Sequence, residues 1–178
     1  MVVIGSNLLE LIESEGICSS SAYDKFSISL TLGKTIFRAK THQDGVLRYG
    51  SQDVSHFYKR EELDGGALIV DARESVLASS HEKIKMPLGY IGLLQTKGTL
   101  ARMFMLAHCS DSQIEPGFSG AVTLELCNLS PWPIEIPIGS PVAQMFLLRC
   151  STGVTEGYSG KYADSDIPTI PVPILKGP

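Results

Sequence analysis

Two carboxylates, Glu115 and Glu125, stand ten residues apart in a stretch that joins a tight turn to a strand. The turn is EPGFSG, residues 115–120, and the alternating run AVTLEL, residues 121–126, follows at once. Alternation of apolar and polar residues is typical of a strand with one buried face, which places Glu125 in mid-strand on the opposite face from Val122, Leu124 and Leu126. A carboxylate held there could move protons as a general base and acid. The alternative is a solvent-facing glutamate on an exposed sheet face.

Cations that could hold phosphate come shortly before this stretch, in KGTLAR, residues 97–102. Arg102 offers a planar guanidinium that matches phosphate oxygens, and Lys97 adds a second charge. Gly98 and Thr99 would add an open backbone and a hydroxyl group. Arg102 could instead form an ordinary surface ion pair.

A short amphipathic helix is predicted at residues 7–15, with Ser6 as its N-cap and Gly16 as its end. Its buried stripe is expected to be Leu8, Leu11 and Ile12, with Leu9 at the margin. This is the only clear helical pattern, and it predicts a single principal helix at the N-terminus.

Short strands dominate the remainder of the chain. Residues 26–32 alternate cleanly and predict a strand that ends at Gly33, with residues 34–40 as a hairpin partner. Further strands are predicted at residues 67–70, 76–78, 90–94, 133–137 and 142–149. Residues 43–64 are polar and irregular and predict a long surface loop around short strands. Many short strands punctuated by glycine and proline favour an all-β sandwich or barrel.

The composition bounds the class of protein. The 178 residues are most simply one domain, and no run of about 18 apolar residues predicts a membrane span. The N-terminus lacks the basic flank and long apolar stretch of a secretory signal, so we expect a cytoplasmic protein. A net charge of −4 argues against non-specific binding of nucleic acid.

The four cysteines, Cys18, Cys109, Cys127 and Cys150, are widely spaced and contain no CxxC pair. Zinc-dependent deaminases carry an HxE sequence followed by PCxxC. Because both are lacking, we expect no zinc site and no other metal ligands, and the cysteines are interpreted as small buried hydrophobes in a reducing compartment.

From about residue 152 the chain is rich in glycine, serine and proline. Residues 167–173, IPTIPVP, have an extended character, because proline biases its predecessor toward β or polyproline geometry. They cannot form a strand in the middle of a sheet. The segment is either a frayed terminus or a flexible arm.

Residues 114–125, IEPGFSGAVTLE, resemble the pattern IDPG[FW]xGx[IV]xLE of dCTP deaminases, which share a fold with trimeric dUTPases. KGTLAR resembles that family's phosphate-binding RSSLxR, and SISLTLG, residues 27–33, resembles SIDLRLG. YSGKY, residues 158–162, resembles the family's tail. The resemblance covers nearly the whole chain in order.

The resemblance implies a dUTPase-like distorted jelly roll or β-barrel, assembled as a homotrimer with active sites between subunits. It implies hydrolytic deamination of dCTP to dUTP, or to dUMP if the enzyme is bifunctional, with Mg²⁺ carried on the triphosphate. Glu125 would be the catalytic carboxylate, assisted by Arg102. The positions that it assigns to nucleotide binding are Lys97, Gly98, Thr99, Leu100, Ala101, Arg102, Glu115, Thr123, Leu124, Gln144, Tyr158 and Lys161. The C-terminal arm would fold over the nucleotide or onto a neighbouring subunit.

Four departures from the family pattern leave other functions open. Gly98 stands where the family has serine, Glu115 where it has aspartate, and Ser165 where it has glutamine, while Ile-Pro-Thr replaces Gly-Pro-Thr at residues 167–169. Glu115 could serve only to order its turn. The alternatives to a deaminase are a dUTPase and a nucleotide-binding regulatory homologue with weakened catalysis.

Overall fold

The N-terminal helix begins one residue earlier than its capping pattern predicts. A computed structural model describes residues 1–40, 45–50 and 54–173. Helix α1 (Ser6–Glu15) is capped by Gly5, which has a φ of +64°. The Gly5 carbonyl oxygen accepts the first hydrogen bonds of the helix, from the N–H groups of Leu8 and Leu9, so Ser6 is not the N-cap. The helix ends as predicted at Gly16, in the left-handed conformation. Leu8 and Ile12 are buried, which docks α1 against the sheet.

Strand β3 (Ser27–Ala39) runs straight through the position predicted to end it. The predicted hairpin between residues 26–32 and 34–40 is therefore wrong. Gly33 lies at an irregularity in the pairing of β3 with its neighbour β6, and a Cβ there would be 2.9 Å from the carbonyl oxygen of Ser79. The glycine permits this close backbone approach, not a turn.

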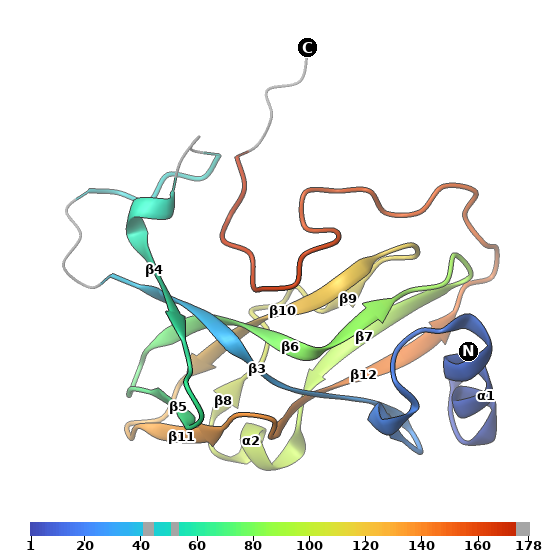
Figure 1. Cartoon of the computed structure of the whole chain (residues 1–178), viewed down its shortest axis with the longest axis horizontal. Coiled ribbons are helices and arrows are strands. Elements are labelled where there is room, and N and C mark those ends of the chain that lie inside the picture. Colours follow the sequence, from blue (N-terminus) through green and yellow to red (C-terminus); the bar gives the residue numbers. More distant parts are fainter. Residues whose placement is uncertain (41–44, 51–53, 174–178) are drawn as a thin grey trace.

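The strands form one large curled sheet, a half-barrel, so the fold is mainly β as predicted (Figure 1). Its hydrogen-bonded order is β8-β10-β6-β3-β12-β7-β9, with β1 on β12 and with β2 and β4 on β3. A separate pair joins β5 to β11. The pairs between these strands of the described residues are antiparallel. Strand β3 connects the two halves of the sheet, which is why its length matters.

The strands predicted at residues 67–70, 90–94, 133–137 and 142–149 are present with nearly these bounds, whereas β6 is much longer than the predicted 76–78 and β1, β2, β8 and β9 have no predicted counterpart. The strands other than β3, together with a short helix, complete the described part of the fold. They are β1 (Val2–Val3), β2 (Tyr23–Asp24), β4 (Tyr58–Glu62), β5 (Ala67–Val70), β6 (Ser75–Lys85), β7 (Tyr90–Thr96), α2 (Gly98–Arg102), β8 (Met105–Leu106), β9 (Gln113–Ile114), β10 (Ser119–Asn128), β11 (Ile134–Pro137) and β12 (Pro141–Arg149), with 3₁₀ turns at Ser20–Ala22 and Ser55–Phe57. β4 lies within the stretch 43–64 predicted as a loop around short strands, part of which (residues 43–44 and 51–53) lies outside the described residues. The short helix α2 was not predicted.

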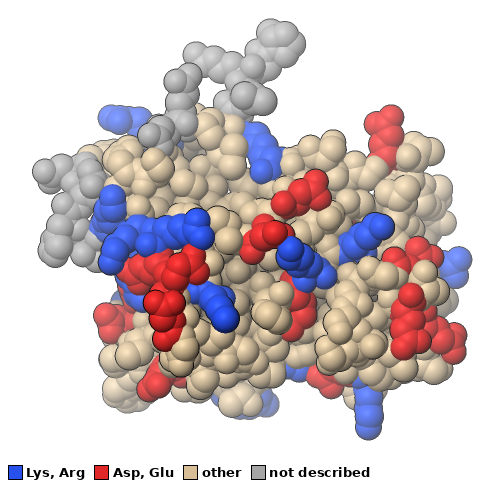
Figure 2. Space-filling model, in the orientation of Figure 1, with Lys and Arg blue, Asp and Glu red and all other residues tan. Residues whose placement is uncertain are grey.

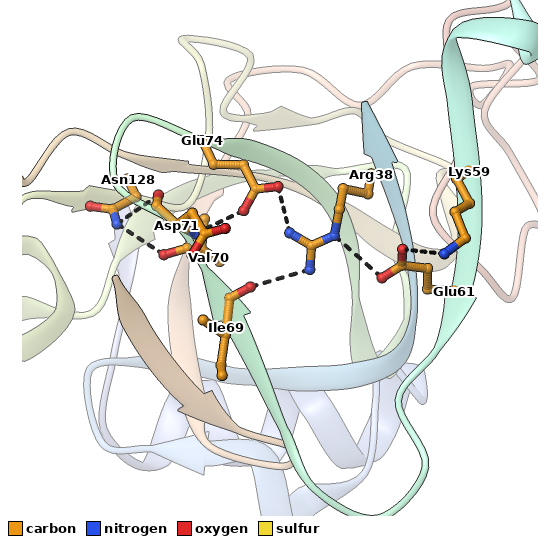
Figure 3. Close-up of polar contacts among 8 residues, drawn as sticks. All are labelled: Arg38, Lys59, Glu61, Ile69, Val70, Asp71, Glu74 and Asn128. Atoms are coloured by element: carbon orange, nitrogen blue, oxygen red, sulfur yellow. Dashed lines mark hydrogen bonds and ion pairs between the residues drawn. The ribbon is translucent and has the colours of Figure 1, made fainter. Parts of the chain in front are cut away.

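Arg38 on β3 ties three strands together (Figure 3). Its guanidinium donates to Glu61 Oε2 at 3.3 Å, Glu74 Oε1 at 2.5 Å and the carbonyl oxygen of Ile69 at 3.2 Å. Burial opposes the charge of Arg38, but its bonds to Glu74 and Glu61 outweigh burial and raise its pKa. Burial likewise opposes ionisation of Glu61, yet the bonds from Lys59 and Arg38 lower the pKa of this carboxyl. The cluster therefore fixes β4 and β5 against β3.

The end of β10 is anchored beside this cluster by a buried amide. Asn128 Nδ2 donates to the carbonyl oxygens of Val70, Asp71 and Trp132 at 3.0, 3.0 and 2.7 Å (Figure 3 shows the first two). Burial makes the loss of such bonds costly, so β10 is held firmly at this end.

The surface carries acidic and basic side chains side by side on the face drawn in Figure 2. Lys59 with Glu61 and Arg60 with Glu62 are two such pairs on β4. No helix within the described part of the chain is long and apolar enough to cross a membrane.

Candidate active site

The turn that precedes β10 is closed by backbone hydrogen bonds and by a glycine contact. The Phe118 N–H donates to the Glu115 carbonyl oxygen at 3.1 Å, and the Gly117 N–H donates to Met86 at 2.9 Å. Gly117 has a φ of +85°, and a Cβ on it would be 2.4 Å from the Cα of Gly157 in the C-terminal segment. The turn thus needs glycine both for its backbone conformation and for contact with the tail.

Strand β10 alternates as its sequence predicts. Val122, Leu124 and Leu126 are buried in the core, while Thr123 and Glu125 lie half-buried on the other face. Their side chains line a cavity of about 390 Å³. Its lining residues are Tyr58, Leu77, Leu94, Asp111, Gln113, Ile114, Glu115, Phe118, Ala121, Val122, Thr123, Glu125, Tyr158, Tyr162, Thr169, Ile170 and Pro171. Glu125 therefore faces a concave site, not open solvent.

The Glu125 carboxylate is held by the loop that follows β8. Its Oε2 accepts a hydrogen bond from the backbone N–H of Cys109 at 2.5 Å, and its own N–H donates to the Ala107 carbonyl oxygen at 3.1 Å. The N–H of Cys109 orients one carboxylate oxygen, so the other is available to a ligand in the cavity. This arrangement suits a positioned proton acceptor and donor.

The C-terminal segment closes one side of the cavity (red in Figure 1). Ser165 bridges Gly120 in parallel, and its carbonyl oxygen accepts from the Ala121 N–H at 2.8 Å. The Thr169 N–H donates to Thr123 Oγ1 at 3.1 Å, and the two threonine hydroxyls lie 3.2 Å apart. The described part of the tail therefore packs onto its own protomer beside β10.

Ser165 and Lys161 have local roles within this tail. Ser165 Oγ donates to the Ile167 carbonyl oxygen at 2.7 Å, and Lys161 Nζ donates to the Pro173 carbonyl oxygen. Tyr158 does line the cavity, with its ring centroid 6.2 Å from that of Phe118. Of the two predicted tail residues, the structure brings Tyr158 to the cavity and directs Lys161 into the tail.

The electrostatic character of the cavity is negative. Asp111, Glu115 and Glu125 line it, whereas none of the described residues that line it is a lysine or an arginine. Burial raises the pKa of Tyr58, which also lines the wall, and thereby favours the neutral phenol. A triphosphate would need positive charge from outside this lining.

The predicted phosphate-binding segment lies elsewhere on the protomer. Helix α2 is at the bottom of Figure 1, and the tail that closes the cavity is at the top. Arg102 is exposed and donates to the Gly98 carbonyl oxygen of its own helix at 2.8 Å. Lys97 Nζ pairs with Asp24 Oδ2 at 2.6 Å. One protomer thus does not bring the predicted cations to the predicted carboxylate.

Five other predicted positions lie apart from the cavity lining. Leu100 and Leu124 are buried in the core, so that only their backbone could meet a ligand. Gln144 is half-buried on β12, where it pairs in register with Gln95 and Ser29. The exposed Thr99 and Ala101 lie with Arg102 on α2.

Sequence reasoning missed several residues of the cavity. Tyr58 comes from a polar stretch with no recognisable pattern, and Asp111 comes from the irregular loop before β9. Thr169 carried a signal, because its Pro-Thr pair matches the family's Gly-Pro-Thr. The bond from Cys109 uses a backbone N–H, which side-chain identity does not predict. Within the described residues, no three His, Cys, Asp or Glu side chains are grouped so as to hold a metal ion.

Comparison with known proteins gives a consistent family. Residues 5–150 match the family model described as dCTP deaminase-like. A dUMP-forming dCTP deaminase of Corynebacterium glutamicum is 39% identical over 99 residues, covering 55% of this chain and 52% of the relative. A dUMP-forming dCTP deaminase of Streptomyces griseus is 35% identical over 108 residues, covering 58% and 56%. The chain spans about half the length of these curated relatives.

Among solved structures, a 2′-deoxycytidine 5′-triphosphate deaminase from Agrobacterium tumefaciens superposes with a TM-score of 0.73 at 20% identity. The match covers 85% of this chain and 49% of the other, and at this identity it supports the fold. The family match extends from the turn before α1 to the residue after β12, and so includes α2, the turn and β10. The chain belongs to the dCTP deaminase-like family.

Proposed function

We propose that this protein hydrolytically deaminates dCTP, with Glu125 as the group that transfers protons. The proposal rests on the placement of Glu125. Its side chain lines a cavity that the C-terminal segment closes on one side, and its carboxylate is oriented by the Cys109 N–H. The matched relatives are named dCTP deaminases, which supports the same reaction class.

The reaction adds water to C4 of the cytosine and releases ammonia, giving a uracil nucleotide. Glu125 takes a proton from the attacking water and returns protons to N3 and to the leaving amine. In this proposal the backbone of Thr123 and Leu124 reads the pyrimidine edge; Thr123 lines the cavity, and Leu124 is the next residue on the same strand. Tyr158 and Phe118 supply an aromatic wall. The magnesium ion belongs to the nucleotide in this proposal, held by phosphate oxygens, and no side chain is assigned to it.

The phosphate-binding cations come from a second copy of the chain in a homotrimer. Supporting this, Arg102 is exposed on α2 and does not line the cavity that contains the carboxylate it should assist. Large apolar side chains also remain exposed near α2 and the end of β10, including Phe104 at 63% and Trp132 at 67%. Exposed apolar surface of this kind favours an interface, and a ring of identical copies would bring α2 of one to β10 of the next.

A substrate panel tests the activity. Ammonia released from dCTP, but not from dCMP or CTP, would support the proposal. Pyrophosphate released from dUTP alone would instead identify a dUTPase, and nucleotide binding without turnover would identify a regulatory homologue. Pyrophosphate released together with ammonia from dCTP would indicate dUMP as the product, the outcome that the names of the relatives favour.

Mixing two impaired variants, assayed at a dCTP concentration well below the KM of Arg102→Ala, tests the shared site. If each site combines Glu125 of one protomer with Arg102 of another, co-expressed Glu125→Gln and Arg102→Ala chains should restore activity at about one quarter of the sites. Each variant expressed alone provides the matched control. Activity in the mixture no greater than the sum of the two variants would place both residues in one protomer's site and overturn the shared arrangement.

A further inference from the structure

Two cysteines far apart in sequence meet beside the proposed catalytic carboxylate. Cys109 Sγ and Cys127 Sγ lie 3.0 Å apart. Cys127 follows Glu125 by two positions on β10, so their side chains share a face of the strand. Cys109 follows β8, which pairs with β10 through Leu106 opposite Cys127. The prediction that the cysteines are small buried hydrophobes is confirmed for Cys127, which is buried, and is wrong for Cys109, which is exposed.

The loop carrying Cys109 is attached to β10 at two points. Its backbone N–H donates to Glu125 Oε2 at 2.5 Å, and its thiol contacts that of Cys127. Cys127 Sγ is also approached by Ser75 Oγ at 3.2 Å, which fixes the buried thiol in place. Any covalent change between the two sulfurs therefore acts on the same residue that orients Glu125.

We propose that Cys109 and Cys127 form a reversible intramolecular disulfide that slows proton transfer by Glu125. The effect on turnover rests on the proposed deaminase function, whereas formation of the bond does not. The sulfurs need to approach by about 1 Å to reach a disulfide length of about 2.05 Å, a movement that an exposed loop residue can make. Cys18 and Cys150 are half-buried free thiols outside this pair.

A peroxide is the oxidant class that the proposal requires. The exposed Cys109 thiolate attacks one peroxide oxygen, breaks the O–O bond and becomes a sulfenic acid with release of hydroxide. The Cys127 thiolate then attacks the Cys109 sulfur, forming the S–S bond and releasing a second hydroxide. Two thiols thus lose two electrons, hydrogen peroxide gains them, and the two thiol protons convert the hydroxides to water. A small dithiol reverses the bond by exchange.

The environment of Cys109 sets the rate of the first step. Burial of the thiol, its contact with Cys127 and the nearby Glu125 carboxylate raise the pKa of Cys109 to about 12. The thiolate is therefore scarce at neutral pH, and the rate of oxidation should rise about tenfold per pH unit below that value. The site would respond to sustained, not brief, oxidation.

The disulfide would hold the Cys109 N–H on the Glu125 carboxylate. A hydrogen bond donated to the ionised form favours that form over the protonated one. Glu125 must become protonated in each proposed cycle, so the carboxylate has to weaken this bond or move. When both thiols are reduced, the loop can move the Cys109 N–H away from the Glu125 carboxylate, whereas the disulfide prevents this movement. We expect at least a tenfold loss of turnover in the oxidised protein.

The test exposes the full chain to hydrogen peroxide, then maps its peptides without reduction and measures dCTP turnover. Wild type and the matched control Cys150→Ser should form the Cys109–Cys127 bridge, lose turnover at least tenfold and recover with dithiothreitol. Cys127→Ser should form no bridge, keep its turnover and accumulate a sulfenic acid at Cys109 that dimedone traps. The serine hydroxyl can still accept from Ser75, and Cys127→Ala serves if that variant does not fold.

Each outcome decides between clear alternatives. A bridge that leaves turnover unchanged, or equal inactivation of Cys127→Ser, would overturn the control of Glu125. Absence of the bridge after prolonged exposure at alkaline pH would overturn the site itself. If the reduced protein does not deaminate dCTP, the proposed function fails, while the peptide map still decides whether the disulfide forms.

Discussion

Replacing Glu125 by glutamine separates proton transfer from the shape of the cavity. The amide has the size of the carboxylate, and its oxygen can still accept from the Cys109 N–H, which lies 2.5 Å from Oε2 in the wild type. The substitution replaces one charge-assisted hydrogen bond by a neutral one and changes no other described hydrogen bond of the side chain. The free energy of unfolding should therefore change by about 1 kcal/mol or less. The cavity and the tail that closes it should stay intact.

The effect on turnover should be far larger than the effect on folding. General acid–base assistance contributes roughly two to four decades in rate. Since Glu125 is the proposed carrier for both the water proton and the protons delivered to the base, its loss should reach about four decades. This corresponds to about 5.5 kcal/mol of transition-state stabilisation. Nucleotide affinity should change by less than about fivefold, or about 1 kcal/mol.

Ammonia release under saturating dCTP measures turnover, and calorimetric titration measures affinity. Glu135→Gln is the matched control, because Glu135 is an exposed glutamate on strand β11 and does not line the cavity. That control should retain wild-type values. If Glu125→Gln keeps more than about a tenth of wild-type turnover, the proton carrier lies elsewhere, and the mid-strand carboxylate is only a polar residue on a sheet face.

Three further perturbations test the parts around this carboxylate. Arg102→Ala removes only an exposed bond to its own helix, so unfolding in urea should be unchanged, while titration should show dCTP affinity one to two decades weaker, or about 1.5–3 kcal/mol. Gly117→Ala places a Cβ 2.4 Å from the backbone of the tail at a φ of +85°. We expect this variant to lose at least about 1–2 kcal/mol of unfolding free energy in urea and to have a higher KM for dCTP. The control Gly89→Ala, whose Cβ meets no atom within 4 Å, should keep the wild-type stability and KM. Because contacts lower the pKa of Glu61, its contribution to stability is present above the ordinary glutamate pKa and is lost as pH falls through the lowered value. Arg38→Met should therefore reduce the urea midpoint at about pH 7 and flatten its decline toward about pH 3, and an unchanged acid slope would contradict the role of the pair.

Local pattern was enough to predict the strand that carries Glu125. The alternation in β10 assigned Val122 and Leu124 to the core and Glu125 to the opposite face, because a period of two leaves only one way to bury the apolar side chains. The helix and most strands followed from the same periodicity. These patterns depend only on residues close in sequence, so they can be recognised without knowledge of the rest of the fold.

The failures share a different cause, which is contact between segments distant in sequence. Gly33 was interpreted as the end of a strand, although it serves a close approach to Ser79 across the sheet. The sequence analysis predicts only small buried hydrophobes at the cysteines, although antiparallel pairing of β8 with β10 brings the sulfurs of Cys109 and Cys127 together. Neither contact changes the local pattern, because tertiary packing alone creates it.

The charge of the cavity gives a physical reason for a site shared between copies. Three carboxylates line it, and a unit negative charge of the nucleotide at about 8 Å from one of them is repelled by about 2 kcal/mol at an effective dielectric constant of about 20. Several such repulsions, between the charges of the triphosphate and the three carboxylates, would oppose binding of a triphosphate to an isolated protomer. Cations on α2 of a second copy would reverse the sign of the electrostatic potential where the phosphates lie. In the proposed trimer, separation of the carboxylates from the cations within one chain would make nucleotide binding depend on assembly, and the mixed-variant experiment tests whether the two sets of residues act across copies.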